Sequence, residues 1–170
     1  RRNGKNEIAA MRELYGLQRG ENILHTAHRT TTSHAAWERL CSLLDKAKIE
    51  YRSIRASGRE SIRLKSGEGR IEFRTRSSKG GLGEGFDLLI IDEAQNLSPK
   101  QMKTLITRAG PGTKIVCLGN IAQIDTPYLT EGSSGLTYVV ERFQGWPHAA
   151  TITLTRGERS RLADFATEAL

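Results

Sequence analysis

Two adjacent carboxylates, Asp92 and Glu93, directly follow an uninterrupted apolar run. Such a run predicts a strand buried on both faces, and open α/β sheets bind their ligands where these strands end. At that place Asp92 could hold Mg²⁺ through water, Glu93 could orient and deprotonate an attacking water molecule, and Gln95 could sense the phosphate under attack. In the alternative interpretation the acids form an ordinary turn, and Asn96 and Ser98 only cap a helix.

The opening residues, RRNGKN, have the composition of a phosphate-binding loop. Gly4 lets the backbone approach a phosphate, and the amine of Lys5 can reach the β- and γ-phosphates of a nucleotide, with Arg2 as a further candidate ligand. Asn6 stands where Ser or Thr usually supplies a hydroxyl to Mg²⁺, so any metal contact there departs from the common pattern. Alternatively, Lys5 is an ordinary solvated lysine. The strand that normally feeds such a loop is not in this sequence, so we expect the sheet without it.

Polar residues also follow the apolar segment 114–118. Asn120 could hold the attacking water or report on the γ-phosphate, although Asn after Gly is also a favourable turn residue. Further along, Arg156 and Arg159 lie in the segment TRGERSR. An arginine there could stabilise the charge that develops on a transferred phosphoryl group, in cis or across a subunit interface.

The spacing of apolar residues predicts helices and strands in alternation around these candidates. Helices are expected at about residues 6–17, 33–47, 99–109, 136–143 and 161–170, and strands at 23–27, 86–91, 114–118 and 150–154. Ser33, and Ser98 followed by Pro99, are the expected caps of the second and third helices. Three further segments, 51–54, 61–64 and 70–74, alternate polar and apolar residues, which predicts antiparallel or peripheral strands. The pattern therefore indicates an α/β fold with a mainly parallel sheet.

The chain carries a net charge of +7, and 18 of its 26 Lys and Arg residues lie in residues 1–86. A dense basic segment could neutralise phosphates along a nucleic acid, or it could be a solvated strand face. Few aromatic residues accompany it to stack on bases. The basic residues of this segment are Arg52, Arg55, Arg59, Arg63, Lys65, Arg70, Arg74, Arg76 and Lys79.

A length of 170 residues fits one domain spanning residues 1–170. The longest apolar stretches fall far short of the ~20 residues of a membrane-spanning helix. The chain does not open on a signal peptide, so we expect a cytoplasmic protein without a membrane partner. Cys41 and Cys117 stand in apolar runs, which suits buried thiols better than a disulfide.

Two resemblances meet at the strand that ends in Asp92. Residues 1 to about 95 resemble the ATPase domain of the large terminase subunits of tailed phages, on RRNGKNE, ILHTAH, IRLKSGEGRIEFRTRSSKGGLGEGF and DLLIIDEAQ. Residues from about 88 to 170 resemble the PhoH family of ATPases, on LIIDEAQNLSPKQMKTLITRAGPGTKIVCLGNIAQIDTPYLTEGSSGLTYVVERF and LTRGERSRLADFA. The chain therefore looks like a terminase-like front and a PhoH-like back joined at a shared magnesium-binding strand.

Both resemblances imply a RecA-like P-loop NTPase core that binds ATP and Mg²⁺. Carried over residue by residue, they assign Gly4 and Lys5 to phosphate, Asp92 to Mg²⁺ and Glu93 to catalysis. The PhoH resemblance also implies a homo-oligomer. It adds Asn120, Gln123, Arg156 and Arg159 as nucleotide-responsive positions.

The sequence thus predicts a PhoH-like ATPase coupled to nucleic acid. A fragment of a terminase DNA-packaging motor is the alternative within the enzyme class. A catalytically inactive nucleic-acid-binding or scaffold remnant is the alternative outside it.

Overall fold

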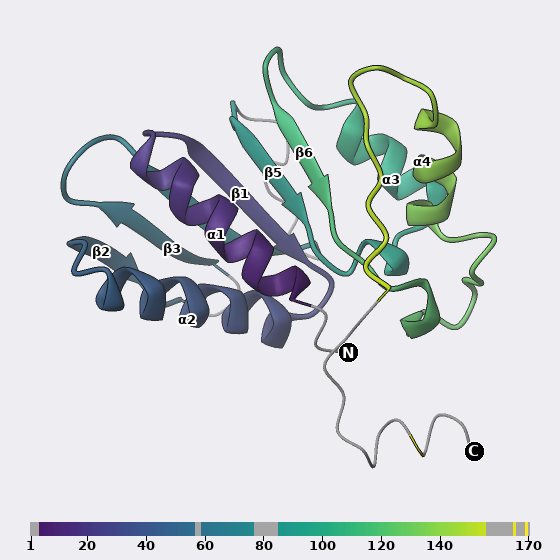
Figure 1. The fold of residues 1–170 in the computed structure, drawn as a ribbon, viewed down its shortest axis with the longest axis horizontal. Coiled ribbons are helices and arrows are strands. Elements are labelled where there is room, and N and C mark those ends of the chain that lie inside the picture. Colours follow the sequence, from purple (N-terminus) through teal and green to yellow (C-terminus); the bar gives the residue numbers. More distant parts are fainter. Residues whose placement is uncertain (1–3, 57–58, 77–84, 156–164, 166–168, 170) are drawn as a thin grey trace.

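A six-stranded sheet organises the computed structural model of the chain, which describes residues 4–56, 59–76, 85–155, 165 and 169 (Figure 1). The strands lie in the order β2-β3-β4-β1-β5-β6. They are β1 (Asn22–Ala27), β2 (Tyr51–Ile54), β3 (Arg59–Leu64), β4 (Arg70–Thr75), β5 (Leu88–Ile91) and β6 (Lys114–Cys117). The helices are α1 (Lys5–Gln18), α2 (Thr30–Lys46), α3 (Pro99–Ile106) and α4 (Gly135–Phe143), with short 3₁₀ turns η1 (Ala94–Asn96) and η2 (Ile121–Gln123).

The sheet is mainly parallel, as the sequence predicts. β4, β1, β5 and β6 run parallel to one another, whereas β2 and β3 join antiparallel to one side of β4. Parallel strands need crossover connections, and the chain supplies α2 and α3 for them. The carboxyl ends of β1 and β5 therefore lie beside each other at one edge of the parallel part.

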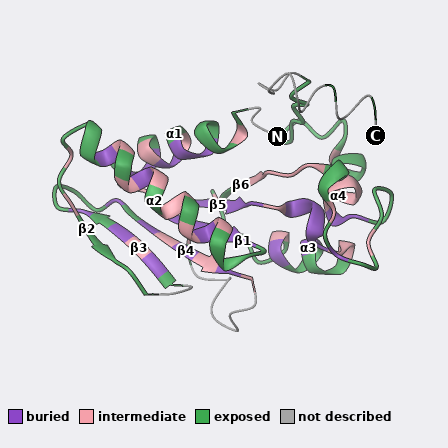
Figure 2. Cartoon of the chain, turned by 90° about the horizontal axis from the view of Figure 1, so that it is seen from below, coloured by how far each residue is buried: buried purple, intermediate pink, exposed green. Residues whose placement is uncertain are grey.

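Helices cover the two faces of the sheet unequally. α1 and α2 pack on one face, over a core that includes Leu17, Leu40, Ile71 and Phe73. α3 packs on the opposite face against Leu24, Leu89 and Ile91 of β1 and β5, so in Figure 2 the helices lie on different sides of the strands. The alternating burial of β3 and β4 places Ile62, Leu64, Ile71 and Phe73 toward α1 and α2.

The start of α2 differs from the sequence expectation. Ser33 was the expected cap, but it lies inside the helix, which begins at Thr30. The chain turns directly after β1, and the backbone N–H groups of His28 and Arg29 in that turn donate to the carboxylate of Glu93. A carboxylate at a helix N-terminus interacts favourably with the helix dipole. A distant residue thus provides the stabilisation expected from the local serine.

The start of α3 agrees with its sequence signal. Ser98 accepts a hydrogen bond from the backbone N–H of Gln101, and the Gln101 side chain accepts one from the backbone N–H of Ser98, with Pro99 at the first helical position. The helix ends at Ile106, three residues before the predicted end at 109. This capping box fixes the direction of the chain after η1.

The strand predicted at 150–154 is absent from this described part of the chain. These residues pair with no neighbouring strand, and the Ile152 side chain is 83% exposed. A strand needs a partner for its backbone groups, which an alternating sequence cannot supply alone. The predicted helix at 161–170 lies outside the described residues except for positions 165 and 169, and the Gly-rich segment 77–84 lies wholly outside them.

Two further expectations concern the whole chain. Cys41 and Cys117 are free thiols, each of them half-buried. Among the helices in the described ranges, none combines the length and apolarity that crossing a bilayer requires.

Candidate functional site

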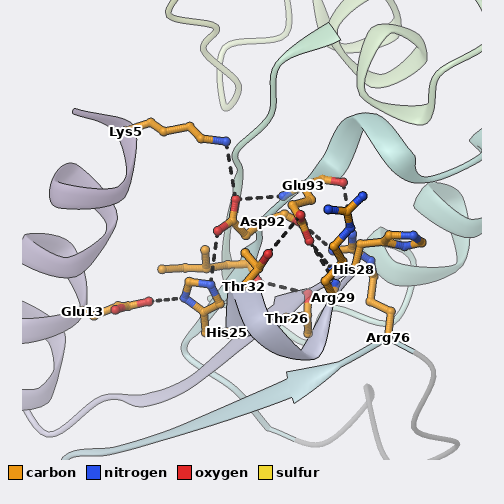
Figure 3. A network of polar contacts seen from close by, with 11 residues as sticks. Lys5, Glu13, His25, Thr26, His28, Arg29, Thr32, Arg76, Asp92 and Glu93 are labelled. Carbon is orange, nitrogen blue, oxygen red and sulfur yellow. Dashed lines mark hydrogen bonds and ion pairs between the residues drawn. The ribbon is translucent and has the colours of Figure 1, made fainter. Parts of the chain in front are cut away.

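The start of α1 and the end of β5 meet at Asp92. The Lys5 Nζ atom lies 3.7 Å from Asp92 Oδ1, although the two residues are 87 positions apart in the sequence (Figure 3). Asp92 is buried, whereas the Lys5 side chain is one quarter exposed. The structure thus brings together the predicted phosphate-binding amine and the predicted magnesium-binding carboxylate.

The backbone directly before α1 is left-handed at Gly4. Gly4 adopts a φ of 78°, in the left-handed region that favours glycine, and among the described residues other than its chain neighbours no atom lies within 4 Å of the position of an added Cβ. No side chain in the described ranges caps the first turn of α1. Free N–H groups and the positive end of the helix dipole together attract anions.

Glu13 and His25 form a buried pair next to Asp92. The carboxylate of Glu13 contacts Nδ1 of His25, and Nε2 of His25 lies 3.7 Å from Asp92 Oδ2. All three residues are at most 4% exposed, and within the described ranges Nε2 has no hydrogen-bond partner. The carboxylate of Asp92 therefore lies between two cations, Lys5 and His25.

Charged neighbours shift the pKa values of His25 and Asp92. Burial alone would lower the pKa of His25, but the carboxylates of Glu13 and Asp92 raise it to about 9. Burial likewise opposes the charge of Asp92, yet the contact with His25 and the charge of Lys5 lower the Asp92 pKa below its ordinary value. Asp92 is therefore an anion, as a magnesium ligand must be.

Glu93 points away from Lys5 and Asp92 (Figure 3). Its backbone is left-handed, with a φ of 52°, which is rare for a residue with a side chain and is often found at functional sites. Its Oε2 accepts hydrogen bonds from the backbone N–H groups of His28 (2.9 Å) and Arg29 (3.0 Å), and its Oε1 accepts one from the Thr32 hydroxyl (3.0 Å). The expected base therefore binds the loop between β1 and α2.

Arg76, at the end of β4, holds the backbone of both acids. Its guanidinium donates to the carbonyl oxygen of Asp92 and, at 3.1 Å, to that of Glu93. Burial lowers the Arg76 pKa to about 10, and the nearby carboxylates of Glu93 and Asp92 limit the decrease. Arg76 remains a cation, so it can stabilise the unusual backbone at Glu93.

Gln95, Asn120 and Gln123 form a second group beside the acids. The buried Gln95 accepts a hydrogen bond from the backbone N–H of Asn120 (3.2 Å) and donates one to the carbonyl oxygen of Gln123 (3.1 Å). The Asn120 side chain accepts from the N–H of Ala122 (3.1 Å) at the start of η2. A Cβ on Gly119 would stand 2.9 Å from Gln95 Oε1, so glycine permits this approach. Gln95 thus links the ends of β5 and β6.

A pocket of about 250 Å³ opens between α1 and α2 and reaches Asp92. Asn6, Glu13, His25 and Thr32 also line it. Asn6 and Asp92, the two predicted magnesium ligands, therefore face one space. No cluster of three or more His, Cys, Asp or Glu residues suited to a metal occurs in the described ranges.

Three predicted site residues, Arg2, Arg156 and Arg159, lie outside the described residues. The sequence pattern predicted no role for Glu13 and His25, and it placed Arg76 in the basic segment that could neutralise nucleic-acid phosphates, whereas the Arg76 guanidinium binds the backbone of Asp92 and Glu93. Glu13 had a signal, because a charged residue on the helix face shared by Ala10 and Leu17 needs a buried partner.

Family models match both parts of the chain. The model described as PhoH-like protein matches residues 82–168. The model of the helicase domain of the RNA cytidine acetyltransferase NAT10/TcmA matches residues 1–116.

Two bacterial relatives agree with the PhoH-like match. Protein PhoH2 of Bacillus subtilis is 46% identical over 105 residues, which cover 62% of this chain and 24% of that protein. Protein PhoH2 of Thermobispora bispora is 41% identical over 83 residues, which cover 48% of this chain and 19% of that protein. The chain thus spans a quarter or less of these relatives.

The similar solved structures are phage proteins. The HK97 bacteriophage large terminase has a TM-score of 0.68 at 15% identity, over 87% of this chain and 32% of that one. A variant of the large terminase ATPase domain of a Thermus phage has a TM-score of 0.57 at 16% identity, over 92% of this chain and 67% of that one. At these identities the likeness establishes the fold.

Proposed function

Because this chain belongs to the PhoH-like protein family, we propose that the site around Lys5 and Asp92 binds ATP with Mg²⁺ and hydrolyses it. The family and the fold make the chain a P-loop NTPase domain. One observation carries the proposal of catalysis. The amine of Lys5 and the buried carboxylate of Asp92 lie 3.7 Å apart, at the N-terminus of α1.

The residues of the loop before α1 hold the phosphates in this proposal. Gly4 and the first N–H groups of α1 contact phosphate oxygens, and Lys5 reaches the β- and γ-phosphates, with Arg2 beside it. Lys5 also contacts Asp92 at 3.7 Å, so its amine lies beside the proposed magnesium ligand. A nucleotide would place its own negative charge near Lys5.

Asp92 holds Mg²⁺ through water in this proposal, and Asn6 contributes its side-chain oxygen. Both face the same pocket. Mg²⁺ would neutralise the charge of the phosphates. Glu13 and His25 keep Asp92 ionised and in place, as partners of metal-binding carboxylates commonly do.

Glu93 acts as the general base in this proposal. Its carboxylate first has to turn toward the phosphates, because it points away from Lys5 and Asp92 and binds His28, Arg29 and Thr32 (Figure 3). A base must lie within hydrogen-bond reach of the proton it removes, and such contacts often form only when substrate binds. Release of Glu93 from the loop is thus part of the proposed reaction.

Further residues respond to the γ-phosphate in this proposal. Gln95 and Asn120 already touch one another, and Gln123 joins them through its carbonyl oxygen. Arg156 and Arg159 would stabilise charge on the transferred phosphoryl group, from the same chain or from a second copy in a homo-oligomer.

Nucleic acid is the proposed partner of the hydrolysis. The match to an RNA cytidine acetyltransferase helicase domain supports a coupling of this kind, and so does the net charge of +7. The fold likeness to phage large terminases favours a second candidate, a fragment of a DNA-packaging motor. The occupied carboxylate of Glu93 favours a third candidate, an inactive nucleic-acid-binding or scaffold remnant.

ATP turnover with and without Mg²⁺ tests the proposal, with Glu93→Gln as the chemical variant. We expect Mg²⁺-dependent turnover in the parent chain and a decrease of about 100-fold or more in Glu93→Gln, with ATP still bound. Glu141→Gln, on the exposed part of α4, is the matched control. If the parent chain turns over ATP no faster than Glu93→Gln while it binds nucleic acid, the remnant is the correct interpretation.

A further inference from the structure

Three arginines stand in one row across the strands β2, β3 and β4. Arg52 pairs directly with Arg63 in the antiparallel register, and Arg63 pairs directly with Arg70. Residues that pair directly point to the same face of a sheet. All three are exposed, and we call them the arginine row. Neighbouring strands are about 5 Å apart, so the row spans about 10 Å.

The arginine row lies on the face of β2–β4 opposite α1 and α2. Ile62, Leu64, Ile71 and Phe73 alternate with the exposed residues of β3 and β4 and are buried under those helices. α3 covers the other face only at β1 and β5, through the core residues around Leu89. Figure 2 shows exposed residues along β2 and β3, and α1 and α2 on one side of these strands. Within the described ranges, no helix thus covers this half of the sheet on that face.

Little negative charge compensates the row. On this face of β2–β4, within the described ranges, Glu72 is the one carboxylate, and Arg74 binds it at 2.8 Å. In the adjoining segments, Glu50 binds Lys65 at 3.1 Å, and Glu68 is exposed in the turn between β3 and β4. Arg70 donates to the neutral side chain of Asn22 at 2.9 Å.

Like charges placed directly opposite each other destabilise a sheet. Charged residues on an edge strand commonly prevent edge-to-edge aggregation, which could explain Arg52 on the edge strand β2. That explanation does not extend to Arg63 and Arg70, because β3 and β4 are interior strands. A repulsive row across three strands is instead suited to an anionic ligand that spans them.

We propose that the arginine row binds the phosphodiester backbone of a nucleic-acid duplex. Guanidinium groups donate in a planar fork that matches phosphate oxygens. Arg59 pairs with Arg74 about 14 Å along the strands from the row and extends the positive surface. Proteins that bind single strands usually stack bases on aromatic side chains, and on this face β2–β4 carry none within the described ranges. A duplex presents its phosphates on the outside and needs no such stacking.

The inference rests on the proposed coupling to nucleic acid and deepens it by assigning the surface and the form of the partner. The contacts are to phosphates, so binding is independent of sequence and sensitive to salt. Each phosphate contact to a duplex contributes about 0.9 to the slope of log K against log salt concentration.

Fluorescence anisotropy of a labelled 20-base-pair DNA duplex at several salt concentrations tests the inference, with the full chain and without nucleotide. In the double variant Arg52→Gln with Arg63→Gln, we expect weaker binding and a salt slope smaller by about 2. The matched control is Arg108→Gln with Arg142→Gln, which removes two exposed arginines from α4 and the turn after α3. The control is expected to keep the slope of the parent chain.

Other outcomes would overturn the inference. One is an equal loss of binding in the two double variants. Another is that the parent chain binds a single strand of the same sequence more tightly than the duplex, and that Arg52→Gln with Arg63→Gln weakens the binding of this single strand. A third is row-dependent binding to phosphatidylserine vesicles, which would indicate a membrane surface. The unfolding temperature of Arg52→Gln with Arg63→Gln shows whether this variant folds. Because the substitutions remove repulsion between paired arginines, we expect a value equal to or higher than that of the parent chain. The measurement needs no ATP, so failed ATP hydrolysis in the parent chain would leave its outcome unchanged.

Discussion

His25 Nε2 and Asp92 Oδ2 lie 3.7 Å apart in the interior, where both residues are at most 4% exposed. The carboxylate of Glu13 on α1 stabilises the protonated form of His25, and the other oxygen of Asp92 contacts Lys5 at the start of the same helix. One helix thus contacts the end of β5 twice, once through Lys5 and once through Glu13 and His25. A shift of α1 relative to the sheet would disturb both contacts.

The first prediction concerns Glu13→Gln. The amide can still accept a hydrogen bond from His25 but carries no charge, so it holds His25 and Asp92 less firmly. We expect the Mg²⁺ concentration for half-maximal ATP turnover to rise by about 10- to 100-fold, with a smaller change in kcat. Titration of turnover with Mg²⁺ at saturating ATP measures both.

Glu7→Gln is the control for this prediction. Glu7 also lies on α1, but it is exposed and pairs with Arg39 at 2.8 Å. An equal change in both variants, or an unaltered Mg²⁺ dependence in Glu13→Gln, would contradict a role of Glu13 in holding Asp92.

The second prediction concerns stability against pH. The ordinary pKa of His25 is 6.5, and the folded chain raises it to about 9 because Glu13 and Asp92 outweigh burial. Below pH 6.5 the ring is protonated in both the folded and the unfolded chain, so its full contribution is present. Between these values only the folded chain holds the proton, so the free energy of unfolding decreases as pH rises.

Urea unfolding at a series of pH values from 6.5 to 9 measures this slope. We expect the parent chain to lose on the order of 1 to 3 kcal/mol across the window. His25→Gln is expected to lose much less. The thiol of Cys117, whose pKa burial raises to about 11, contributes above this window. Equal slopes in the parent chain and in His25→Gln would show that His25 is not charged in the folded chain.

The third prediction concerns Arg76→Lys. Lysine keeps the charge but cannot donate to the two carbonyl oxygens of Asp92 and Glu93 in the planar geometry of a guanidinium. We expect the free energy of unfolding to fall by about 1 to 3 kcal/mol, because the left-handed backbone at Glu93 loses its support. Urea unfolding at fixed pH measures the change. Arg108→Lys, on the exposed turn after α3, is expected to leave stability unaltered, and an equal decrease there would contradict the prediction.

The sequence predicts the parts of the site that follow local rules. Asp92 was identifiable because a buried strand ends in charge, and Lys5 because Gly4 precedes it at the start of a helix. The sheet was predictable for a similar reason, since continuous apolar runs marked β1 and β5 and alternating runs marked β3 and β4.

Residues whose role depends on a distant partner were not predictable. His25 is one polar residue within an apolar strand, and only its contacts with Glu13 and Asp92 distinguish it from an ordinary core residue. Arg76 belongs to a long basic segment in which nothing local marks the one arginine that turns inward. The segment 150–154 alternates like a strand. A strand also needs a neighbouring strand, and the sequence of the segment alone does not specify one.

The direction of the Glu93 side chain was not predictable either. Its position at a strand end predicted a base, yet its carboxylate binds donors 61 to 65 residues earlier in the chain. This arrangement leads to the fourth prediction, Thr32→Val, which removes the hydroxyl donor at 3.0 Å and keeps the shape of the side chain. If Glu93 has to leave the loop before it can act on water, loss of the Thr32 hydrogen bond raises the fraction of molecules in which the Glu93 carboxylate is released from the loop.

We therefore expect Thr32→Val to increase basal ATP turnover by several-fold, up to the roughly tenfold effect of a hydrogen bond to a charged group. Thr31→Val is the matched control, because Thr31 precedes it on α2, lines the same pocket and has no hydrogen bond to Glu93 within the described ranges. Steady-state turnover at saturating ATP and Mg²⁺ compares the three chains. A slower Thr32→Val enzyme beside an unaltered Thr31→Val enzyme would contradict the proposed release, because the hydroxyl of Thr32 would then hold Glu93 in its working position.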